Sequence, residues 1–455
     1  MTTSTIAAIA TPQAAGGIGI IRISGSEALS IADRIFLPIS GNDIKKSKGY
    51  RAYFGKACDR GEQLDEAVCL VFRAPHSYTG EDVVEISCHG GLYITKRILE
   101  AAISAGAKPA EAGEFTKRAF LNGKIDLSEA EAVMGMISAQ GEQAAKAALT
   151  ALEGALSNEI SQTAREVISV SANIAAWVDY PDEDIEEMEI SSMREIFTGA
   201  KNKLLKLLNK FDAGQAIISG VDTAIAGRPN VGKSTLMNLL AGCEKSIVTS
   251  IAGTTRDIVE ETVRVGDVTL RLSDTAGIRE TDNPVESIGV ERARTKLQRA
   301  VLILAVFDGS QEMTSEDEEL LNLCRDRLSI AVINKGDKGR IIDEEKIKAV
   351  VSRTVNVCAA DGSGYDELCK TVSELLGTDS FDPSSAMIST VRQKECCQRA
   401  VRCLDEAIDA IDCSMTLDAV NVCADSCIEA LLELTGEKAS EAVVNEVFSK
   451  FCVGK

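Results

Sequence analysis

The spacing of apolar and polar residues changes along the chain and predicts segments of different structure. Residues 1–118 carry short alternating runs separated by glycine turns, as in Gly16–Gly25, which predicts strands in an α+β domain. Residues near 125–215 are rich in Ala, Glu and Leu at helical spacing. Ser128–Gln140 and Met193–Phe211 are examples, so this segment predicts long helices.

The second half of the chain switches pattern twice. Residues 216–378 alternate apolar runs with helical patterns, which predicts a doubly wound, mostly parallel sheet. Residues 380–455 are helical again, so the simplest architecture inserts the α/β domain into an all-α helical domain. We predict domains at 1–118, 119–215, 216–378 and 379–455, with linkers at Asp212–Ser219 and Thr378–Ser385.

Length and composition indicate a soluble protein with more than one domain. The 455 residues are 45% hydrophobic and 26% charged. The longest apolar run, Val301–Phe307, fits a buried strand and is too short to span a membrane. Met1–Gln13 has no basic residue and no signal peptide layout. We therefore expect a cytoplasmic protein without membrane contact.

The charge balance limits the kind of partner. The formal net charge of −20 argues against a generally basic nucleic-acid-binding surface. It leaves room for a local basic patch, or for a partner that supplies one. The acidic run Asp182–Glu189 is most simply a solvated loop or the start of a helix.

Cysteines are numerous, 14 in all, and concentrate between Cys396 and Cys452. In the cytoplasm we expect reduced thiols rather than disulfides. The alternative is a metal cluster, but the spacings match no paired Cys-x-x-Cys frame and the chain has only 2 histidines. We interpret these cysteines as small apolar residues buried on helices.

Gly227–Ser234 carries the most specific motif, Gly-Arg-Pro-Asn-Val-Gly-Lys-Ser, which fits a phosphate-binding loop. The apolar run Val221–Ala226 before it predicts a buried strand, and Thr235–Leu240 after it predicts the start of a helix. In that frame, backbone N–H groups cradle phosphates, Lys233 reaches the β- and γ-phosphates, and the Ser234 hydroxyl binds Mg²⁺. A glycine-rich turn without a ligand is the alternative, and it does not require this frame.

Asn334–Asp337 follows the apolar run Ile330–Ile333 and has the Asn-Lys-x-Asp pattern of GTP-binding proteins. The carboxylate of Asp337 can accept from the ring N–H and the exocyclic amino group of guanine, whereas adenine would leave it unpaired. The tetrapeptide alone also fits a surface turn. Its place at a strand end downstream of a phosphate loop favours base binding.

Cys358–Ala360 follows the predicted strand Thr354–Val357 and is expected to complete the base site. GTPases usually have Ser-Ala there, so the cysteine departs from the pattern.

Asp274–Gly277 ends the alternating run Val268–Ser273. Its aspartate can hold Mg²⁺ through water, and the N–H of its glycine can sense the γ-phosphate. Between this motif and the phosphate loop, Gly253–Asp257 contains Thr255, a natural residue to close over Mg²⁺.

Further motifs lie outside the α/β segment. They are Gly17–Gly25, Tyr78–Asp82, Cys88–Gly91, Gly113–Lys124, Asp179–Glu183 and the final Phe451–Lys455. With them, the chain resembles over its whole length the MnmE (TrmE) family of tRNA uridine-5-carboxymethylaminomethyl modification GTPases. The last residues look like the family's Cys-x-Gly-Lys tail, with Val453 where Ile or Leu is usual. The resemblance implies an α/β GTPase domain inserted into an all-α helical domain and preceded by an α+β folate-binding domain.

The resemblance also implies that residues 1–118 dimerise and bind a folate that carries a one-carbon unit. The folate is 5,10-methylenetetrahydrofolate, with 5-formyltetrahydrofolate as an analogue. Arg22, Glu85 and Lys124 match the family's folate contacts, and Lys455 reaches over from the tail. A carboxylate can pair with the donor edge of a pterin, and Arg or Lys can hold the glutamate tail. Without the resemblance, each of these residues would be interpreted as part of a surface salt bridge.

Stimulation by K⁺ is a further implication of the resemblance. Asn230 matches the residue whose side-chain oxygen helps hold K⁺, and the loop Thr249–Thr254 supplies backbone oxygens. A cation there neutralises charge on the β–γ bridge, as an arginine finger does. Ras-like enzymes position water with a glutamine where this chain has Ile278. Glu286 matches the glutamate that takes this role in the family; from the sequence alone it would be a solvated carboxylate at a helix start.

The predicted site residues form several sets. Those expected to act in catalysis are Glu286, Lys233 and Thr255. The expected Mg²⁺ ligands are Ser234 and Thr255, and the expected K⁺ ligands are Asn230, Thr249, Ile251 and Thr254. The predicted GTP-binding residues are Asn230, Val231, Gly232, Lys233, Ser234, Thr235, Thr249, Ser250, Ile251, Ala252, Gly253, Thr254, Thr255, Asp274, Thr275, Ala276, Gly277, Asn334, Lys335, Gly336, Asp337, Cys358, Ala359 and Ala360. Cys452 is a candidate for the modification step, a hypothesis that normal tRNA modification by Cys452→Ser would exclude.

We therefore expect a homodimeric GTPase that helps install a carboxymethylaminomethyl or aminomethyl group on C5 of the tRNA wobble uridine. The resemblance implies a flavoprotein partner, MnmG, which carries FAD and joins this chain in a heterotetramer. That partner can supply most of the RNA surface, which reconciles the net charge of −20 with a tRNA substrate. GTP hydrolysis then drives a conformational change, because switch loops order around the γ-phosphate.

Two alternatives are open. A ribosome-assembly GTPase would explain the nucleotide motifs, but not the N-terminal motifs or the tail. A folate-sensing signalling GTPase would bind both ligands and leave tRNA unaltered.

Overall fold

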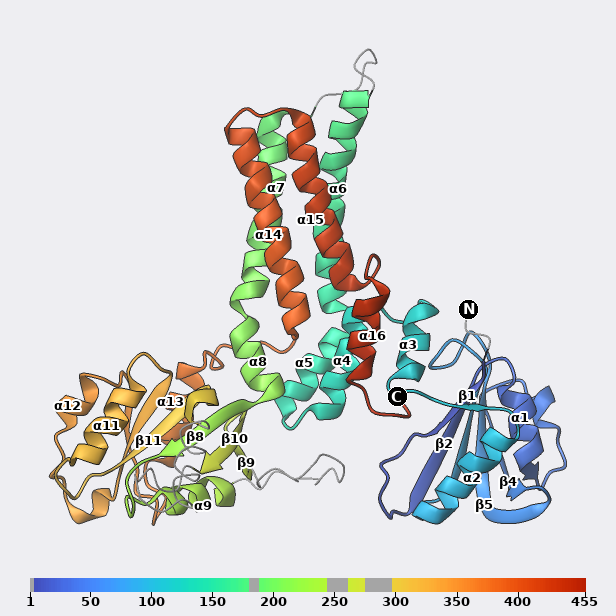
Figure 1. Cartoon of the computed structure of the whole chain (residues 1–455), viewed down its shortest axis with the longest axis horizontal. Helices are drawn as coiled ribbons and strands as arrows, with labels where there is room; N and C mark the ends of the chain where they lie inside the picture. Colours follow the sequence, from blue (N-terminus) through green and yellow to red (C-terminus); the bar gives the residue numbers. More distant parts are fainter. Residues whose placement is uncertain (1–3, 180–187, 244–260, 275–296) are drawn as a thin grey trace, which may run out of the picture. The chain divides into compact units, whose positions relative to one another are not determined.

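The structure, a computed structural model, describes residues 4–179, 188–243, 261–274 and 297–455 (Figure 1). The chain divides into two compact units. The first is formed by residues 1–134, 157–201 and 396–455, and the second by residues 135–156 and 202–395.

The N-terminal part of the first unit is an α+β domain on one sheet, with strand order β3-β4-β5-β6-β2-β1-β7. The strands are β1 (Ile6–Ile9), β2 (Ile18–Ser24), β3 (Phe36–Pro38), β4 (Arg51–Asp59), β5 (Glu62–Phe72), β6 (Val83–His89) and β7 (Lys108–Pro109). All neighbours are antiparallel except β1 and β7. The apolar stripes of α1 (Ala28–Ile35) and α2 (Leu92–Ser104) share one core with the strands. The short elements η1 (Ile44–Lys46) and α3 (Glu114–Leu121) complete this part.

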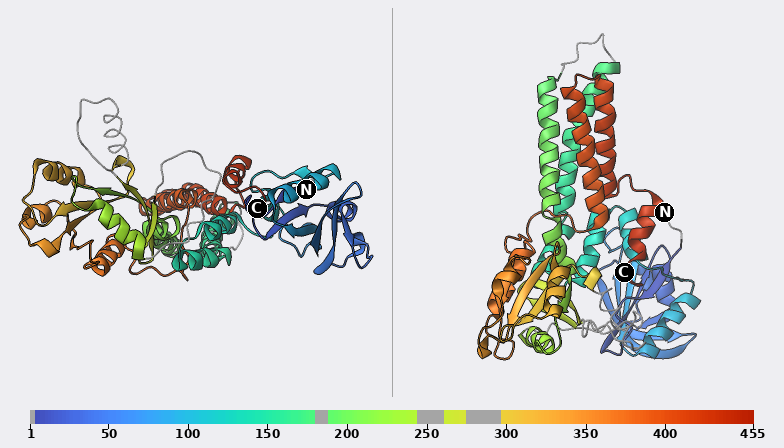
Figure 2. Two further views of the ribbon diagram at one scale, coloured as in Figure 1. Left: turned by 90° about the horizontal axis from the view of Figure 1, so that it is seen from below. Right: turned by 60° about the vertical axis from the view of Figure 1, so that its left-hand side comes forward.

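Long helices from two distant parts of the chain lie side by side in a bundle (Figures 1 and 2). They are α6 (Ala155–Asp179), α7 (Ile190–Asn209), α14 (Val391–Asp412) and α15 (Leu417–Thr435). Arg194 on α7 pairs with Asp412 on α14 at 2.8 Å, and Ser171 on α6 donates to Asp425 on α15 at 2.8 Å. The helices α4 (Leu127–Ser138) and α16 (Glu441–Ser449) pack together through Leu127 and Phe448. Helical segments from before and after the α/β domain therefore pack together, which confirms the predicted insertion.

The second unit is built on a six-stranded sheet with strand order β13-β12-β11-β8-β10-β9. Its strands are β8 (Val221–Ala226), β9 (Glu261–Val265), β10 (Val268–Asp274), β11 (Leu302–Asp308), β12 (Ser329–Asn334) and β13 (Thr354–Asn356). Only β9 runs antiparallel to its neighbour. Every residue of β11 and β12 is buried, which explains their continuous apolar runs.

Helices cover both faces of this sheet, as a doubly wound fold requires. One core contains residues of α9 (Lys233–Cys243) and α13 (Tyr365–Leu375), and the other contains residues of α11 (Ser315–Cys324) and α12 (Glu344–Lys348). Two further helices, α5 (Glu142–Leu152) and α8 (Phe211–Ser219), and the short η2 (Gly336–Lys338) belong to the same unit. The doubly wound prediction is confirmed.

The structure corrects one predicted linker. Asp212–Ser219 forms most of α8, and Ala216 and Ile217 are buried in a core of the second unit. Thr378–Ser385 contains no helix or strand, as predicted. Most of the acidic run, residues 182–187, lies outside the described residues. In the described parts of the chain, none of the helices combines the length and apolar character that a membrane span needs.

Candidate functional site

The predicted phosphate loop connects the carboxyl end of β8 to the start of α9. Its Asn230 and Gly232 have left-handed backbone, with φ of 65° and 100°. A Cβ at Gly232 would lie 2.2 Å from Nδ2 of Asn334, so only glycine fits there. The buried Lys233 donates from Nζ to the carbonyls of Gly227 at 2.7 Å and Arg228 at 2.9 Å. These bonds hold the ammonium group inside the curl of the loop, where the sequence predicts phosphates.

One buried amide joins the phosphate loop to the base loops. Asn334, 3% exposed, donates from Nδ2 to the carbonyl of Val231 at 2.8 Å. Its Oδ1 accepts from the N–H of Ala359 at 3.0 Å. The three loops follow β8, β12 and β13, which are parallel, so their carboxyl ends meet at one edge of the sheet. This edge is where ligands bind in open α/β sheets.

Lys335 is held from two sides. Its Nζ donates to the carbonyl of Asn230 at 2.6 Å and to Oδ2 of Asp308 at 2.7 Å. Asp308, at the end of β11, also accepts from the N–H and hydroxyl of Ser310. Burial raises the pKa of the Asp308 carboxyl, but the hydrogen bonds from Lys335 and Ser310 outweigh this and leave the pKa below its usual value. An ionised Asp308 therefore fixes the lysine of the base loop.

Asp337, the carboxylate predicted to recognise the base, has a thiol neighbour. Asp337 is exposed, and the buried Cys358 donates from Sγ to Oδ1 of Asp337 at 3.6 Å. The cysteine that departs from the usual serine therefore still carries a hydrogen-bond donor toward the aspartate. Gly336 and Ala360 are exposed beside it, as a base-binding surface requires.

The remaining predicted nucleotide residues fall partly inside and partly outside the described residues. Ser234 and Thr235 are exposed at the start of α9. Asp274 is the last residue of β10 and is in register with Ile225 on β8, so it lies at the same sheet edge. Outside the described residues are Thr249, Ser250, Ile251, Ala252, Gly253, Thr254, Thr255, Thr275, Ala276, Gly277 and Glu286.

A second constellation lies in the N-terminal domain. Arg22 on β2 and Glu85 on β6 are directly opposite each other, and Nε of Arg22 donates to Oε1 of Glu85 at 2.8 Å. The guanidinium lies 5.4 Å from the ring centre of Tyr78 and 5.5 Å from that of Phe115. It also donates to the carbonyl of Gly454 at 3.3 Å. The structure thus brings two predicted folate residues together with two aromatic rings and the tail.

The tail is attached through its backbone. Cys452 accepts from the N–H of Gly113 at 3.3 Å, and Lys455 accepts from the N–H of Phe115 at 3.1 Å. The side chain of Cys452 is exposed. Lys124 donates to the carbonyl of Pro75 at 3.3 Å, and this bond ties it to the segment that carries Tyr78 rather than to Arg22 or Glu85.

The cysteines of the bundle differ in exposure. Cys396, Cys397 and Cys427 are buried, and burial raises the pKa of Cys397 and of Cys427 to about 12. Such thiols are poor nucleophiles and poor metal ligands. Cys403 and Cys423 are half-buried and Cys413 is exposed, so the burial prediction is correct for only part of the set. Within the described ranges, no three His, Cys, Asp or Glu side chains are grouped as a metal site requires.

Sequence reasoning missed several supporting residues. Asp308 had a usable signal, because a polar residue ending a buried strand points to the ligand edge of the sheet. Tyr78 and Phe115 lie in motifs that the sequence singled out, but nothing local indicates that their rings meet Arg22. The contact of Gly454 with Arg22 spans 432 positions and has no sequence signal.

A phosphate loop tied by one asparagine to an Asn-Lys-x-Asp loop, on a doubly wound sheet, defines a GTPase of the phosphate-loop class. The family model for the MnmE helical domain matches residues 127–452, and that for the GTP-binding protein TrmE N-terminus matches residues 5–124. The tRNA modification GTPase MnmE of Acetivibrio thermocellus is 42% identical over 459 residues, with 99% of each chain covered. That of Clostridioides difficile is 39% identical over 454 residues, again with 99% of each covered. The chain belongs to the MnmE family of tRNA modification GTPases.

The chain is similar to Era of Aquifex aeolicus bound to GDP and AlF4⁻, with 29% sequence identity, 40% of this chain and 66% of that chain covered, and a TM-score of 0.28.

Proposed function

We propose that this GTPase uses a folate one-carbon unit to help install a carboxymethylaminomethyl or aminomethyl group on C5 of the tRNA wobble uridine. The observation that carries the proposal is the contact of Arg22 with Glu85, two aromatic rings and the tail. A nucleotide site alone fits many GTPases, whereas this second constellation fits a reduced folate. Both occur in one chain of the MnmE family.

The residues of the N-terminal domain suit a folate. Glu85 can accept from the donor edge of a pterin, and a guanidinium between two rings can hold a flat or anionic group. When bound, the folate supplies a carbon at the oxidation level of formaldehyde. Arg22 and Glu85 would bind and orient it, and the tail already contacts Arg22 through the carbonyl of Gly454. The exposed thiol of Cys452 is a candidate for the modification step.

The nucleotide site suits GTP with Mg²⁺ and K⁺. Lys233 is held inside the phosphate loop, and the exposed hydroxyl of Ser234 is an oxygen ligand of the kind that Mg²⁺ prefers. The side chain of Asn230 is exposed while its carbonyl is fixed by Lys335, so the amide oxygen is free to bind K⁺. The bound cations supply positive charge next to the phosphates. Thr255 and Glu286 are proposed to close the site and orient the water.

The proposed assembly is a homodimer that joins a flavoprotein carrying FAD. The net charge of −20 supports this division, because tRNA then meets a basic surface on the partner. GTP hydrolysis acts as the conformational driver of the complex.

Nucleoside mass spectrometry on tRNA tests the proposal. Cells lacking the gene should lose the wobble C5 aminomethyl-type uridine, and the native chain should restore it. Glu85→Gln should fail to restore it, because the amide cannot accept from both donors of the pterin edge. Glu100→Gln, an exposed carboxylate on α2, is the matched control and should restore it. Unchanged tRNA in the deletion strain would refute the proposal and direct attention to a ribosome-assembly or folate-sensing role.

Salt dependence tests the K⁺ site separately. Replacing K⁺ by Na⁺ should slow GTP hydrolysis by native protein, and Asn230→Ala should remove the difference. Equal native rates in both salts would refute the assignment of Asn230. Glu286→Ala should bind GTP but hydrolyse it poorly, and normal turnover would refute the role of Glu286.

A further inference from the structure

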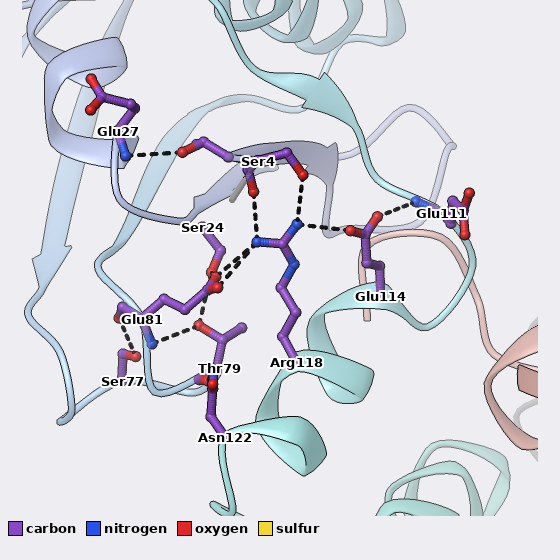
Figure 3. Close-up of polar contacts among 11 residues, drawn as sticks. Ser4, Ser24, Glu27, Ser77, Thr79, Glu81, Glu111, Glu114, Arg118 and Asn122 are labelled. Atoms are coloured by element: carbon purple, nitrogen blue, oxygen red, sulfur yellow. Dashed lines mark hydrogen bonds and ion pairs between the residues drawn. The ribbon is translucent and has the colours of Figure 1, made fainter. Parts of the chain in front are cut away.

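Arg118 on α3 is a buried charged side chain of the N-terminal domain, with 1% exposed. Figure 3 shows its guanidinium among the polar groups that it contacts. Its Nη1 donates to the carbonyl of Ser4 at 2.8 Å and to both carboxylate oxygens of Glu81, at 3.1 and 3.2 Å. Its Nη2 donates to Oε1 of Glu114 at 2.8 Å. One guanidinium thus joins three segments: the residues just before β1, the loop at residues 77–82 and α3.

The carboxylate of Glu81 carries this network into β2. Ser24, at the end of β2, donates to Oε2 of Glu81 at 2.7 Å and lies 2.8 Å from the hydroxyl of Thr79. Ser24 and Thr79 are both fully buried. The carbonyl of Thr79 accepts from Asn122, just after α3, at 2.8 Å. The loop at 77–82 is therefore fixed from both its β2 side and its α3 side.

The segments that Arg118 joins carry the groups around Arg22. Tyr78 lies inside the loop, and its hydroxyl is 2.9 Å from that of Thr116 on α3. Phe115 lies on α3, one turn before Arg118, and its N–H holds the tail. Arg22 itself is two residues before Ser24 on β2. Tyr78, Phe115 and Arg22 line the predicted folate site, called here the one-carbon carrier site. Each lies on a segment that the Arg118 network holds, although Arg118 has no bond to any of the three.

We propose that Arg118 is a positioning residue for the one-carbon carrier site, holding the Tyr78 and Phe115 rings against Arg22 and the tail on α3. The inference rests on the proposed folate function of that site. A guanidinium suits this role because its planar fork reaches Ser4, Glu81 and Glu114 at once, which a lysine ammonium cannot do with fixed geometry. The bonds of Arg118 go to three separate segments rather than to one neighbour, which is the arrangement that positioning requires.

Binding of 5-formyltetrahydrofolate to the full chain tests the inference. Arg118→Gln should weaken binding about tenfold, because the rings of Tyr78 and Phe115 would no longer be held beside Arg22 in the geometry that the ligand needs. Arg118→Lys should bind with intermediate affinity, since it keeps the charge but not the fork. GTP hydrolysis without folate should be unchanged in both. Arg97→Gln is the matched control. Arg97 lies on α2 and also pairs with two carboxylates, Asp59 and Glu62, so the variant should bind 5-formyltetrahydrofolate like the native chain.

A double-mutant comparison separates positioning from general destabilisation. Tyr78→Phe removes only the hydroxyl that meets Thr116. If Arg118 acts by positioning Tyr78, the fold loss in folate affinity of the double variant Arg118→Gln/Tyr78→Phe should be clearly smaller than the product of the two single-variant fold losses. Multiplicative losses would overturn the proposed route through Tyr78.

A milder variant, Glu81→Gln, tests whether the loss of binding is caused by loss of folding. Glu81→Gln keeps the shape and one acceptor oxygen, so it should fold and still weaken folate binding, by less than Arg118→Gln. Unchanged affinity in the folded fraction of Glu81→Gln and both Arg118 variants would overturn the inference. Failure of the native chain to bind 5-formyltetrahydrofolate would instead overturn the folate function itself.

Discussion

At the scale of single residues, the nucleotide site depends on side chains that hold loops rather than touch the ligand. Asn334 fixes the phosphate loop through Val231 and the last base loop through Ala359. Asp308 holds the side chain of Lys335 in the base loop. Because a buried polar group must be paired, each of these bonds limits its loop to one arrangement. The loop that carries Asp337, the residue predicted to recognise the base, is thereby held at both Asn334 and Lys335.

Cys358 should support the orientation of Asp337 through its thiol. Cys358→Ser keeps a donor and should bind GTP with native affinity. Cys358→Val removes the donor and should weaken binding about threefold, because a thiol is a weak donor and Asp337 is exposed. Titration with a fluorescent GTP analogue measures this, with Cys413→Val in the bundle as the control. Equal affinity of Cys358→Val and native protein would contradict the role.

Asp308 should stabilise the second unit in a pH-dependent way. Its folded pKa is lowered, so its contribution is fully present above the unfolded pKa of about 3.9 and is lost as pH falls through the folded pKa. Asp308→Asn should lower the free energy of unfolding by about 1–3 kcal/mol at neutral pH. Urea unfolding at neutral and acid pH measures the difference, which should shrink below about pH 4. Asp326→Asn, on an exposed turn, is the control, and a pH-independent difference would contradict the prediction.

At the scale of elements, α8 is part of the core rather than a tether. Ile217, 2% exposed, packs in the same cluster as the strands of the α/β sheet. Ile217→Ala should lower the free energy of unfolding by about 2–4 kcal/mol, as for other buried aliphatic truncations. Denaturant unfolding followed by circular dichroism measures this. The exposed Asp212→Asn is the control, and a similarly small effect at both positions would return α8 to the status of a linker.

At the scale of the whole molecule, the last residues of the chain return to its first domain. Gly454 has φ of 97°, and a Cβ there would lie 2.3 Å from the carbonyl of Ile9. Gly454→Ala should therefore unseat the tail and weaken binding of 5-formyltetrahydrofolate about tenfold, with GTP affinity unchanged. Calorimetry with each ligand measures this. Val453→Ala, which trims an exposed side chain and keeps the backbone, should bind both ligands normally. Native folate affinity in Gly454→Ala would contradict a role for the seated tail.

Local patterns in the sequence predict most of the elements and the chemistry of the loops. The continuous apolar runs of β11 and β12, the strand–loop–helix frame of Gly227–Ser234 and the helical spacing of the bundle are local patterns, and burial follows directly from them. The same local information misassigned α8, because Asp212, Gly214 and Gln215 make a short helix look like a linker.

Contacts between side chains far apart in the sequence depend on how the elements pack, and local patterns do not predict them. Arg22 reaches Glu85 across 63 positions through strand register, and reaches Gly454 because the tail docks on α3. Asn334 joins three loops because parallel strands end at one edge of the sheet. Periodicity shows which face of an element is buried but not which other element covers it, since that choice depends on the packing of the whole unit. For this reason the motif residues were found from the sequence, whereas the groups that hold them, Asp308, Tyr78, Phe115 and Arg118, required the fold.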